Sequence, residues 1–135
     1  MANSIRIDAG EVTLLVNDDP SRVIKFNPED ILFVEKFYSL LGGFEGVQGR
    51  FQERLNAIPD EGESTAPQVI AVVEEACDFL MEQIDSTFGK GTSDAVFAGV
   101  KSLSQIEQFF LAIAPYVKAK RQDKVTKYQS KAKKS

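Results

Sequence analysis

Apolar and polar residues alternate near the start of the chain, a pattern typical of β-strands. Residues 11–16 are apolar and rich in β-branched side chains, residues 17–21 are dense in turn-forming types, and residues 22–26 resume the apolar pattern. The spacing predicts a β-hairpin that pairs 11–16 with 22–26, with residues 5–8 as an optional extension. A two-stranded ribbon is marginal by itself, so we expect it to pack on helices or on another subunit.

After the hairpin, apolar residues recur every three or four positions, which indicates helices. Asn27 and Pro28 predict a helix start, because Asn is a good N-cap and Pro suits the first helical position. The pair Gly42–Gly43 is expected to stop or kink this helix, and a second periodic stretch follows over residues 44–58. Residues 59–67 are polar and turn-rich, so they form the expected loop.

Residues 67–88 form the most apolar predicted helix. Its apolar residues cover more than one face, which is typical of a helix at the centre of a bundle. Gly89 is predicted to be its left-handed C-cap, and Thr92 or Ser93 the N-cap of a short helix that carries Val96, Phe97 and Val100. The sequence therefore predicts a structural junction that consists of Phe88, Gly89, Gly91, Thr92 and Ser93.

The glycines of this junction, together with Lys90, also invite an interpretation as a phosphate-binding loop. The nucleotide-binding motif needs GxxxxGK[ST] directly after a buried strand. Here a helix precedes the glycines, and Lys90 comes before Gly91 rather than after it. A plain connection between two helices is therefore the favoured interpretation.

The last predicted helix has two alternative capping boxes at its start, Ser102 with Gln105 or Ser104 with Glu107. Its apolar residues fall at alternating spacings of three and four, which is the seam of a packed helix pair. These residues are Leu103, Ile106, Phe110, Ile113 and Val117.

Pro115 lies inside this last helix, where its ring removes a hydrogen bond and clashes with the preceding turn. A kink or break is therefore predicted near Ala114. Beyond Val117 the apolar signal falls away, and we expect a frayed basic helix that passes into disorder, with residues 131–135 unstructured.

Together these elements predict an α+β, mainly helical fold. Residues 1–117 form a single domain, in which a β-hairpin within residues 4–26 packs on four or five helices within residues 28–117. Residues 118–135 form a flexible basic arm. A chain of 135 residues is long enough to bury one core without help.

Three pairs of adjacent large apolar residues do not suit a helix with one buried face. Both members of such a pair cannot easily point into one core, so some of this surface is either wrapped by other elements or is an interface. The pairs are Leu32/Phe33, Phe79/Leu80 and Phe109/Phe110.

Charge is segregated along the chain. Residues 118–135 hold eight basic residues and one acidic residue, a net charge of +7, whereas residues 1–117 hold eight basic and nineteen acidic residues, a net charge of −11. An acidic body with a basic arm predicts a partner that is bound through the arm, or association between copies of the chain. The candidate interaction residues are Lys118, Lys120, Arg121, Lys124, Lys127 and Tyr128.

Two other interpretations of the arm remain open, a solvated tail and a nucleic-acid-binding segment. Nucleic acid is the least favoured, because the acidic body would repel phosphate and Tyr128 is the arm's one aromatic residue for stacking on bases.

The catalytic inventory is thin, because the chain contains no histidine and no tryptophan. A Ser-His-Asp triad and a histidine-based zinc site are therefore excluded. Cys77 lies among apolar residues and is predicted to be a buried small hydrophobe. We predict no catalytic, metal-binding or cofactor-binding residue, and an enzyme that uses carboxylates ranks last among the functions considered.

No apolar run is long enough to span a membrane, and the first residues lack the features of a signal peptide, so a cytoplasmic protein is expected.

Several short segments resemble the tail assembly chaperones of long-tailed bacteriophages and prophages. They are residues 26–30 (FNPED) at the start of the first helix, residues 84–89 (IDSTFG), residues 91–97 (GTSDAVF), and a final helix that runs into a lysine-rich end containing Lys127 and Tyr128. The pattern covers residues 22–128.

This resemblance implies a non-enzymatic protein that binds the tape-measure protein during tail assembly in the host cytoplasm and keeps it soluble. In that family a programmed frameshift often yields a longer product that recruits tail-tube subunits, and self-association is expected. No functional residue carries over from the family. The alternative function is a regulatory protein that binds nucleic acid through the basic arm.

Overall fold

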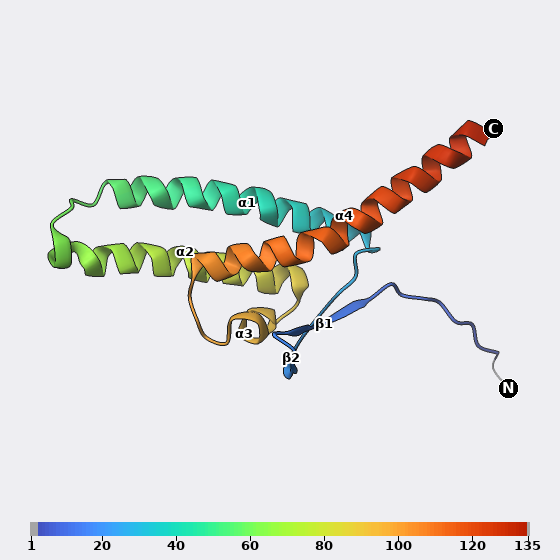
Figure 1. Cartoon of the computed structure of the whole chain (residues 1–135), viewed down its shortest axis with the longest axis horizontal. Coiled ribbons are helices and arrows are strands. Elements are labelled where there is room, and N and C mark those ends of the chain that lie inside the picture. Colours follow the sequence, from blue (N-terminus) through green and yellow to red (C-terminus); the bar gives the residue numbers. More distant parts are fainter. Residues whose placement is uncertain (1–2, 135) are drawn as a thin grey trace.

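The structure is a computed structural model that describes the backbone of residues 3–134 and the side chains of residues 3–118. A β-hairpin is followed by helices, which confirms the α+β, mainly α fold (Figure 1). In chain order the elements are β1 (Val12–Val16), β2 (Asp19–Phe26), α1 (Ile31–Asn56), the 3₁₀ helix η1 (Gly62–Thr65), α2 (Ala66–Phe88), α3 (Thr92–Phe97) and α4 (Leu103–Lys134).

The hairpin pairs β1 with β2 in antiparallel register, with Leu14 opposite Ile24. Its turn is tighter than the sequence predicts, because Asn17 and Asp18 both adopt positive φ angles (+53° and +60°) and β2 begins at the next residue. The predicted pairing is thus confirmed from Val12 to Leu15, whereas a register shift after Leu15 pairs Val16 with Asp19, across a turn of only two residues.

The optional extension of the hairpin is wrong. Residues 3–10 form no strand, and Ile5 and Ile7 remain 83% and 79% exposed. Asn27 ties the end of this segment to the body, because its amide donates a hydrogen bond to the carbonyl of Ala9. Among residues 3–134, the strand-like pattern of residues 5–8 therefore has no pairing partner.

Helix α1 begins three residues later than predicted. Asp30, not Asn27, is the N-cap, and its carboxylate accepts the backbone N–H of Leu32 at 3.0 Å. Asn27 accepts the N–H of Glu29 instead, which makes a turn before the helix.

Helix α1 is also continuous across Gly42–Gly43, so the predicted stop is wrong. A buried stripe runs through the glycine-rich stretch, with Leu40 before it and Phe44 and Val47 within it. Burial of such side chains stabilises by about 1.5–3 kcal/mol each, which outweighs about 1 kcal/mol per glycine in helix propensity.

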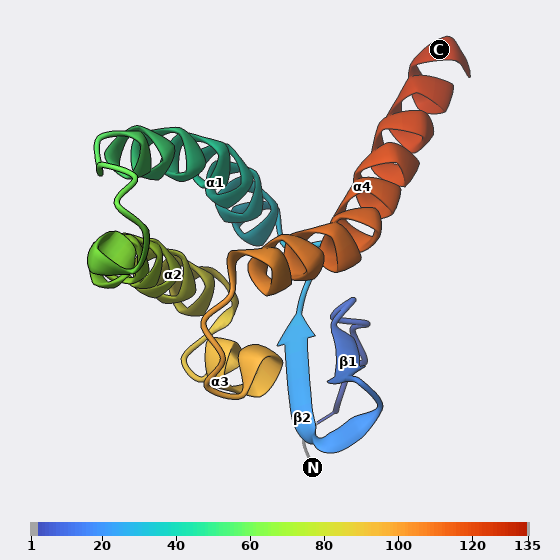
Figure 2. The ribbon, with the colours of Figure 1, turned by 60° about the vertical axis from the view of Figure 1, so that its left-hand side comes forward.

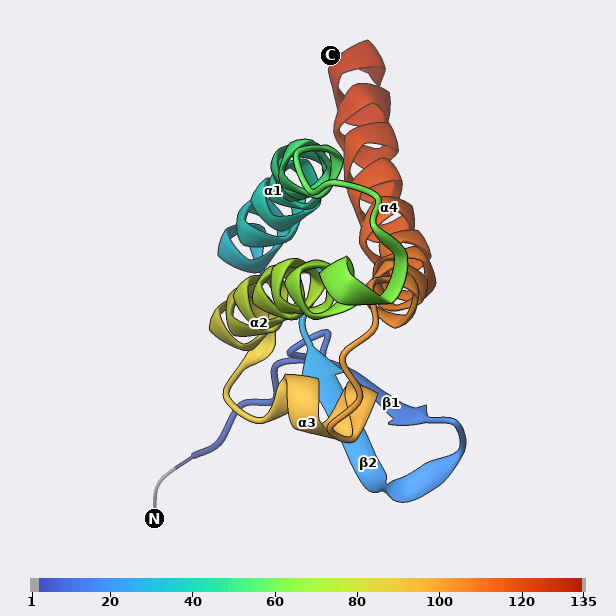
Figure 3. The same ribbon diagram turned by 90° about the vertical axis from the view of Figure 1, so that its left-hand side faces the viewer.

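Helix α2 contacts α1, α3, α4, η1 and β2, which confirms its predicted central position. Figure 3, a view along α1 and α2, shows α4 on one side of this pair and α3 with the hairpin below it. On the opposite side of the α1–α2 pair, the described part of the chain places no other helix or strand (Figure 3). The buried residues of α2 are Val72, Ala76, Cys77, Leu80 and Ile84.

An aromatic cluster joins the hairpin to three helices. The ring of Phe88, at the end of α2, lies 5.9 Å from Phe26, 5.2 Å from Phe33 and 5.1 Å from Phe109, measured between ring centroids. All three contacts are edge-to-face, the geometry that aromatic pairs favour. Phe88 is therefore a terminal core residue of α2, as predicted.

The start of α4 shows one of the two hydrogen bonds of the first predicted capping box. The hydroxyl of Ser102 accepts the N–H of Gln105 at 3.3 Å. Along the predicted seam Leu103 is half-buried, and the remaining members are buried: Ile106, Phe110, Ile113 and Val117.

Helix α4 continues through Pro115 to Lys134 without a break. Its ribbon changes direction between the orange first half, which lies on the body, and the red second half, which points away (Figure 2). This bend is the expected consequence of a proline inside a helix. Residues 131–134, predicted to be unstructured, are helical, and Ser135 lies outside the described residues.

Candidate functional site

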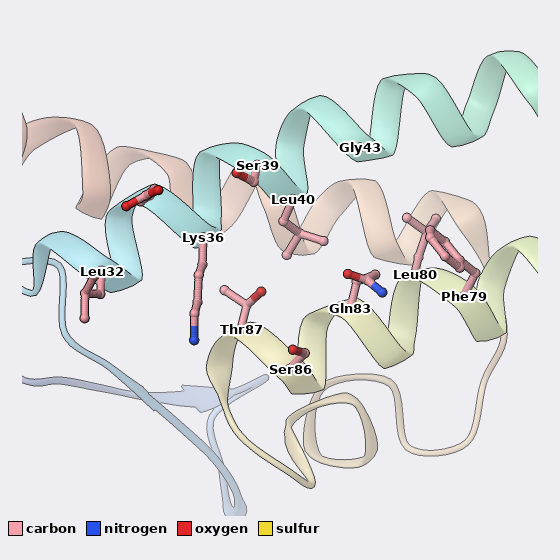
Figure 4. Close-up of a pocket in the computed structure, with 11 residues that line it drawn as sticks. Leu32, Lys36, Ser39, Leu40, Gly43, Phe79, Leu80, Gln83, Ser86 and Thr87 are labelled. Carbon is pink, nitrogen blue, oxygen red and sulfur yellow. The ribbon is translucent and has the colours of Figure 1, made fainter.

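A groove of about 420 Å³ lies on the open side of the α1–α2 pair (Figure 4). Its floor consists of Leu40 and Leu80, which are both buried. The walls are Leu32, Glu35, Lys36, Ser39 and Gly43 from α1 and Phe79, Gln83, Ser86 and Thr87 from α2.

The groove follows from helix periodicity and from small residues. Leu32, Lys36, Ser39 and Gly43 recur at spacings of four, three and four, so they form one stripe along α1. A Cβ atom on Gly43 would meet nothing within 4 Å, so the missing side chain leaves open space in the wall. Small residues line both walls, Ser39 and Gly43 on α1 and Ser86 and Thr87 on α2, and they leave a channel between the two helices.

Two of the adjacent apolar pairs meet at this groove. Phe33 and Leu80 are buried, whereas their neighbours Leu32 and Phe79 remain 64% and 39% exposed. In the third pair, Phe109 and Phe110 are both buried. The third pair is therefore covered by other elements, whereas the first two pairs each leave one apolar side chain exposed. Both exposed side chains lie at the same groove.

Beyond Phe79 the groove continues into a second depression of about 400 Å³. The guanidinium carbon of Arg50 lies 5.7 Å from the centroid of the Phe79 ring, within cation–π range. Leu32 and Arg50 are eighteen residues apart on α1, so the combined groove is about 27 Å long. The residues that line the continuation are Arg50, Phe51, Arg54, Glu75, Asp78, Phe79 and Glu82.

The two walls differ in charge. Helix α1 holds three acidic and three basic residues, whereas α2 holds five acidic residues and no basic residue. Arg54 pairs with Glu75 at 2.8 Å, and its hydrogen bond holds the pKa of that carboxyl below its usual value. Lys101 lies 3.0 Å from Glu74 and 2.9 Å from Asp78.

Glu82, by contrast, forms no ion pair among the residues whose side chains the structure describes. The α2 wall is therefore acidic overall.

The junction after α2 contains the predicted residues in different roles. Gly89 has φ +119° and ψ +149°, which is an extended conformation open essentially to glycine alone, not the left-handed helical one. The N-cap of α3 is Gly91 (φ +91°, ψ −5°), not Thr92 or Ser93. Gly89 is thus the C-cap of α2, as predicted, but not in the predicted left-handed conformation, and the predicted N-caps of α3, Thr92 or Ser93, are wrong.

Thr92 and Ser93 are buried and bind back to the preceding residues. The hydroxyl of Thr92 donates to the carbonyl of Gly89 at 2.7 Å, and that of Ser93 donates to the carbonyl of Met81 at 2.8 Å. The carboxylate of Asp85 accepts the N–H of Ser93 at 2.8 Å, so α2 supplies the acceptor for the start of α3. Tertiary contact therefore replaces the predicted local caps.

Lys90 is exposed, and the described side chains give it neither a hydrogen bond nor an ion pair.

Arg22 is a structural residue that sequence reasoning missed. From β2 its Nε donates to the carbonyl of Ala95 at 2.8 Å and its Nη2 to that of Val96 at 2.5 Å. These are carbonyls at the C-terminal end of α3, where a cation is stabilising. The contact spans more than seventy residues, so no local pattern reveals it.

The basic arm does not contribute to the groove of its own chain. Lys118 is exposed, and the backbone of the arm continues α4 away from the body (Figures 1 and 2). The side chains of the other candidate residues lie outside the described ones: Lys120, Arg121, Lys124, Lys127 and Tyr128.

Within the described part of the chain, no group of acidic, cysteine or histidine residues is placed to hold a metal ion. Over the same residues, no helix is long and apolar enough to cross a membrane.

A model of a family of unknown function, DUF6673, matches residues 21–135. The chain belongs to this family. The match to DUF6673 takes in β2, every helix and the basic arm, and it begins after β1. Searches against curated proteins and against solved structures found no match.

Proposed function

We propose that this protein is a non-enzymatic assembly chaperone that holds a long helical partner, in the manner of the phage tail assembly chaperones that its sequence resembles. The observation that carries the proposal is the α1–α2 groove, about 27 Å long, with Leu32 and Phe79 exposed above a buried apolar floor. Amphipathic helices bind such grooves through apolar residues spaced three and four apart. The proposed partner is the tape-measure protein, in the cytoplasm of a bacterial host, and tail-tube protein is a further candidate.

The groove suits weak, repeated binding. Fully burying a Leu or Phe side chain stabilises by about 1.5–3 kcal/mol, and Leu32 and Phe79 are already partly covered. The gain from two such anchors is offset by the entropy lost on association. One copy therefore holds its partner weakly, whereas several copies along one long helical protein hold it through avidity.

Co-expression with the tape-measure protein of the same phage or prophage tests the proposal. We expect the intact chain to raise the soluble fraction of that protein and to co-purify with it. The double variant Leu32→Ser with Phe79→Ser should lose both effects. Leu111→Ser is the matched control, because Leu111 is 65% exposed on α4 and lies outside the groove.

Two results would contradict this function. In the first, the intact chain neither solubilises nor retains the tape-measure protein. In the second, Leu111→Ser weakens binding as much as the double variant, which would assign the effect to general surface apolarity and not to the groove.

One observation favours the alternative, a regulatory protein that binds nucleic acid. The second half of α4 points away from the acidic body, so the arm is able to approach phosphate without bringing the body with it (Figure 2). Fluorescence anisotropy with labelled duplex and single-stranded DNA tests this at physiological salt. We expect no binding, and micromolar binding that falls steeply with salt would favour the alternative.

A further inference from the structure

We infer that the basic second half of α4 of one copy docks in the α1–α2 groove of a second copy. The inference concerns the same groove as the proposed function, for which a docked arm and a helical partner would compete, and it is tested on this chain alone, so that either can fail without the other. It rests on the direction of the arm, on its length and apolar pattern, and on the charges of the two surfaces.

The arm is not placed to reach its own groove. Val117 is the last buried residue described in α4, and from there the helix leaves the body (Figures 1 and 2). Helix α4 lies on one side of the α1–α2 pair (Figure 3), and the groove lies on the other (Figure 4). Contact between arm and groove therefore requires two molecules.

The arm matches the groove in length and pattern. Residues 118–134 form seventeen residues of helix, about 26 Å, against a groove of about 27 Å. In the sequence of the arm, Val125, Tyr128 and Ala132 follow one another at spacings of three and four. This is the spacing by which a helix presents one apolar stripe to a groove.

The acidic α2 wall of the groove favours a basic occupant. The arm carries a net charge of +7. The α2 wall of the groove and its continuation presents three acidic residues and no basic one (Glu75, Asp78 and Glu82), whereas the α1 wall presents one acidic and three basic residues (Glu35, Lys36, Arg50 and Arg54). Lys101 is bonded to the side of α2 at Glu74 and Asp78, whereas Glu82 lines the continuation of the groove without an ion pair among the described side chains. A second copy thus supplies the opposite charge that this wall lacks.

The predicted contact joins two different surfaces of the molecule. Each copy presents one arm and one groove, so the interface is heterologous and adds copies head to tail without closing. Because the charges are exposed, salt screens the attraction over about 10 Å at 0.1 M.

Sedimentation velocity of the full chain, over a range of concentration at low and high salt, is the first measurement. We expect the mass to rise with concentration at low salt and the association to weaken at least tenfold at 0.5 M salt. A chain that stays monomeric at low salt overturns the inference.

Gly43→Leu fills the groove, because its Cβ points into open space. Gly49→Leu is its matched control, since Gly49 has equally open surroundings and lies about 120° around α1 from Gly43. Both variants gain helix propensity, so loss of folding does not explain a difference between them. We expect Gly43→Leu alone to reduce association, and an equal effect of both changes overturns the groove assignment.

A charge pair of variants tests the acidic wall in the same way. Glu82→Lys should weaken association by about three- to tenfold, the range expected for lost exposed ion pairs together with new repulsion. Glu107→Lys makes the same change in net charge on the exposed side of α4, outside the groove, and should stay within twofold of the original protein. Equal losses in both variants would reduce the effect to net charge and overturn the docking site.

Mixing two defective variants is the decisive arm of the experiment. A full chain with Lys120, Arg121, Lys124 and Lys127 all changed to Gln keeps its groove, and Gly43→Leu keeps its arm. Each variant alone should be monomeric, whereas the mixture should form a one-to-one complex that does not grow. A mixture that stays monomeric overturns the inference, because it would show that arm and groove are not the two halves of one interface.

Discussion

Substitution of Gly89 by valine tests the junction between α2 and α3 directly. Gly89 has φ +119° and ψ +149° and is followed by the buried residues Thr92 and Ser93. Valine resists this backbone conformation, because its β-branched side chain clashes with its own backbone at positive φ. To relieve the strain, the chain would have to release the contacts of Thr92 and Ser93 with the α2 end.

The size of the effect follows from the backbone. A Cβ atom on Gly89 would meet nothing within 4 Å, so no steric clash with neighbouring residues is added. A non-glycine residue held in a glycine-only region costs about 1–3 kcal/mol, and valine belongs at the upper end. Loss of freedom in the unfolded chain offsets up to about 1 kcal/mol. We therefore expect Gly89→Val to lower the free energy of unfolding by about 2 kcal/mol.

Urea denaturation followed by far-UV circular dichroism measures this change, provided that the m-value is unchanged. Gly91→Asn is the comparison, because φ +91° and ψ −5° lie close to the left-handed region that asparagine tolerates, and it should cost less than about 1 kcal/mol. Lys90→Ala should have almost no effect, since Lys90 is exposed.

A free energy of unfolding for Gly89→Val within about 0.5 kcal/mol of that of the original protein, the range of an ordinary surface substitution, would refute this prediction. If, in addition, Lys90→Ala abolished binding of a phosphorylated ligand, the junction would be an anion site rather than a structural hinge.

Two further predictions concern residues in the core and at its edge. Arg22→Met keeps the length of the side chain and removes two hydrogen bonds to the end of α3, so thermal denaturation should show a loss of about 2–4 kcal/mol, with Lys25→Met on the exposed face of β2 as the control. Cys77 is fully buried, and its burial raises the pKa of its thiol. Ellman's reagent should therefore label the thiol slowly at pH 8 and rapidly in 6 M guanidinium chloride. Fast labelling of the folded chain would contradict this packing.

The long helices could be predicted because their pattern is sustained. The apolar residues of α2 and the seam of α4 recur over four or more turns, and a signal of that length outweighs any one unfavourable residue. In α4 even Pro115 bends the helix without ending it. Residues 131–134 are helical despite a weak pattern, because they continue a helix that has already formed.

The errors lie where a local signal competes with tertiary contact. Asn27 is a residue type that favours the N-cap position, but its amide donates a hydrogen bond to the N-terminal segment, and Asp30 is the N-cap instead. Thr92 and Ser93 are good caps by residue type, and the end of α2 uses their hydroxyls instead. Residues 5–8 have a strand pattern, and no strand edge of the same chain pairs with them. In each case the structure is decided by whether a contact forms outside the local segment, which the local sequence does not show.

Of the residues that line the candidate groove, the sequence pattern singled out Leu32, Phe79 and Leu80. Leu32 and Phe79 stood out because each adjoins a second large apolar residue, and one helix face cannot bury both. That the two exposed residues share one groove depends on the antiparallel register of α1 and α2, which no local pattern fixes. Gly43 carried the opposite signal, since it was interpreted as a helix breaker.

The glycines of α1 connect the fold to the groove. Gly42, Gly43, Gly46 and Gly49 each cost about 1 kcal/mol of helix propensity relative to alanine, and a Cβ atom at any of them would meet nothing within 4 Å. The packing of the body therefore requires none of the four. At Gly43 the missing side chain leaves the wall of the groove open. The residue that lowers the stability of α1 therefore also provides the space that a docked helix needs.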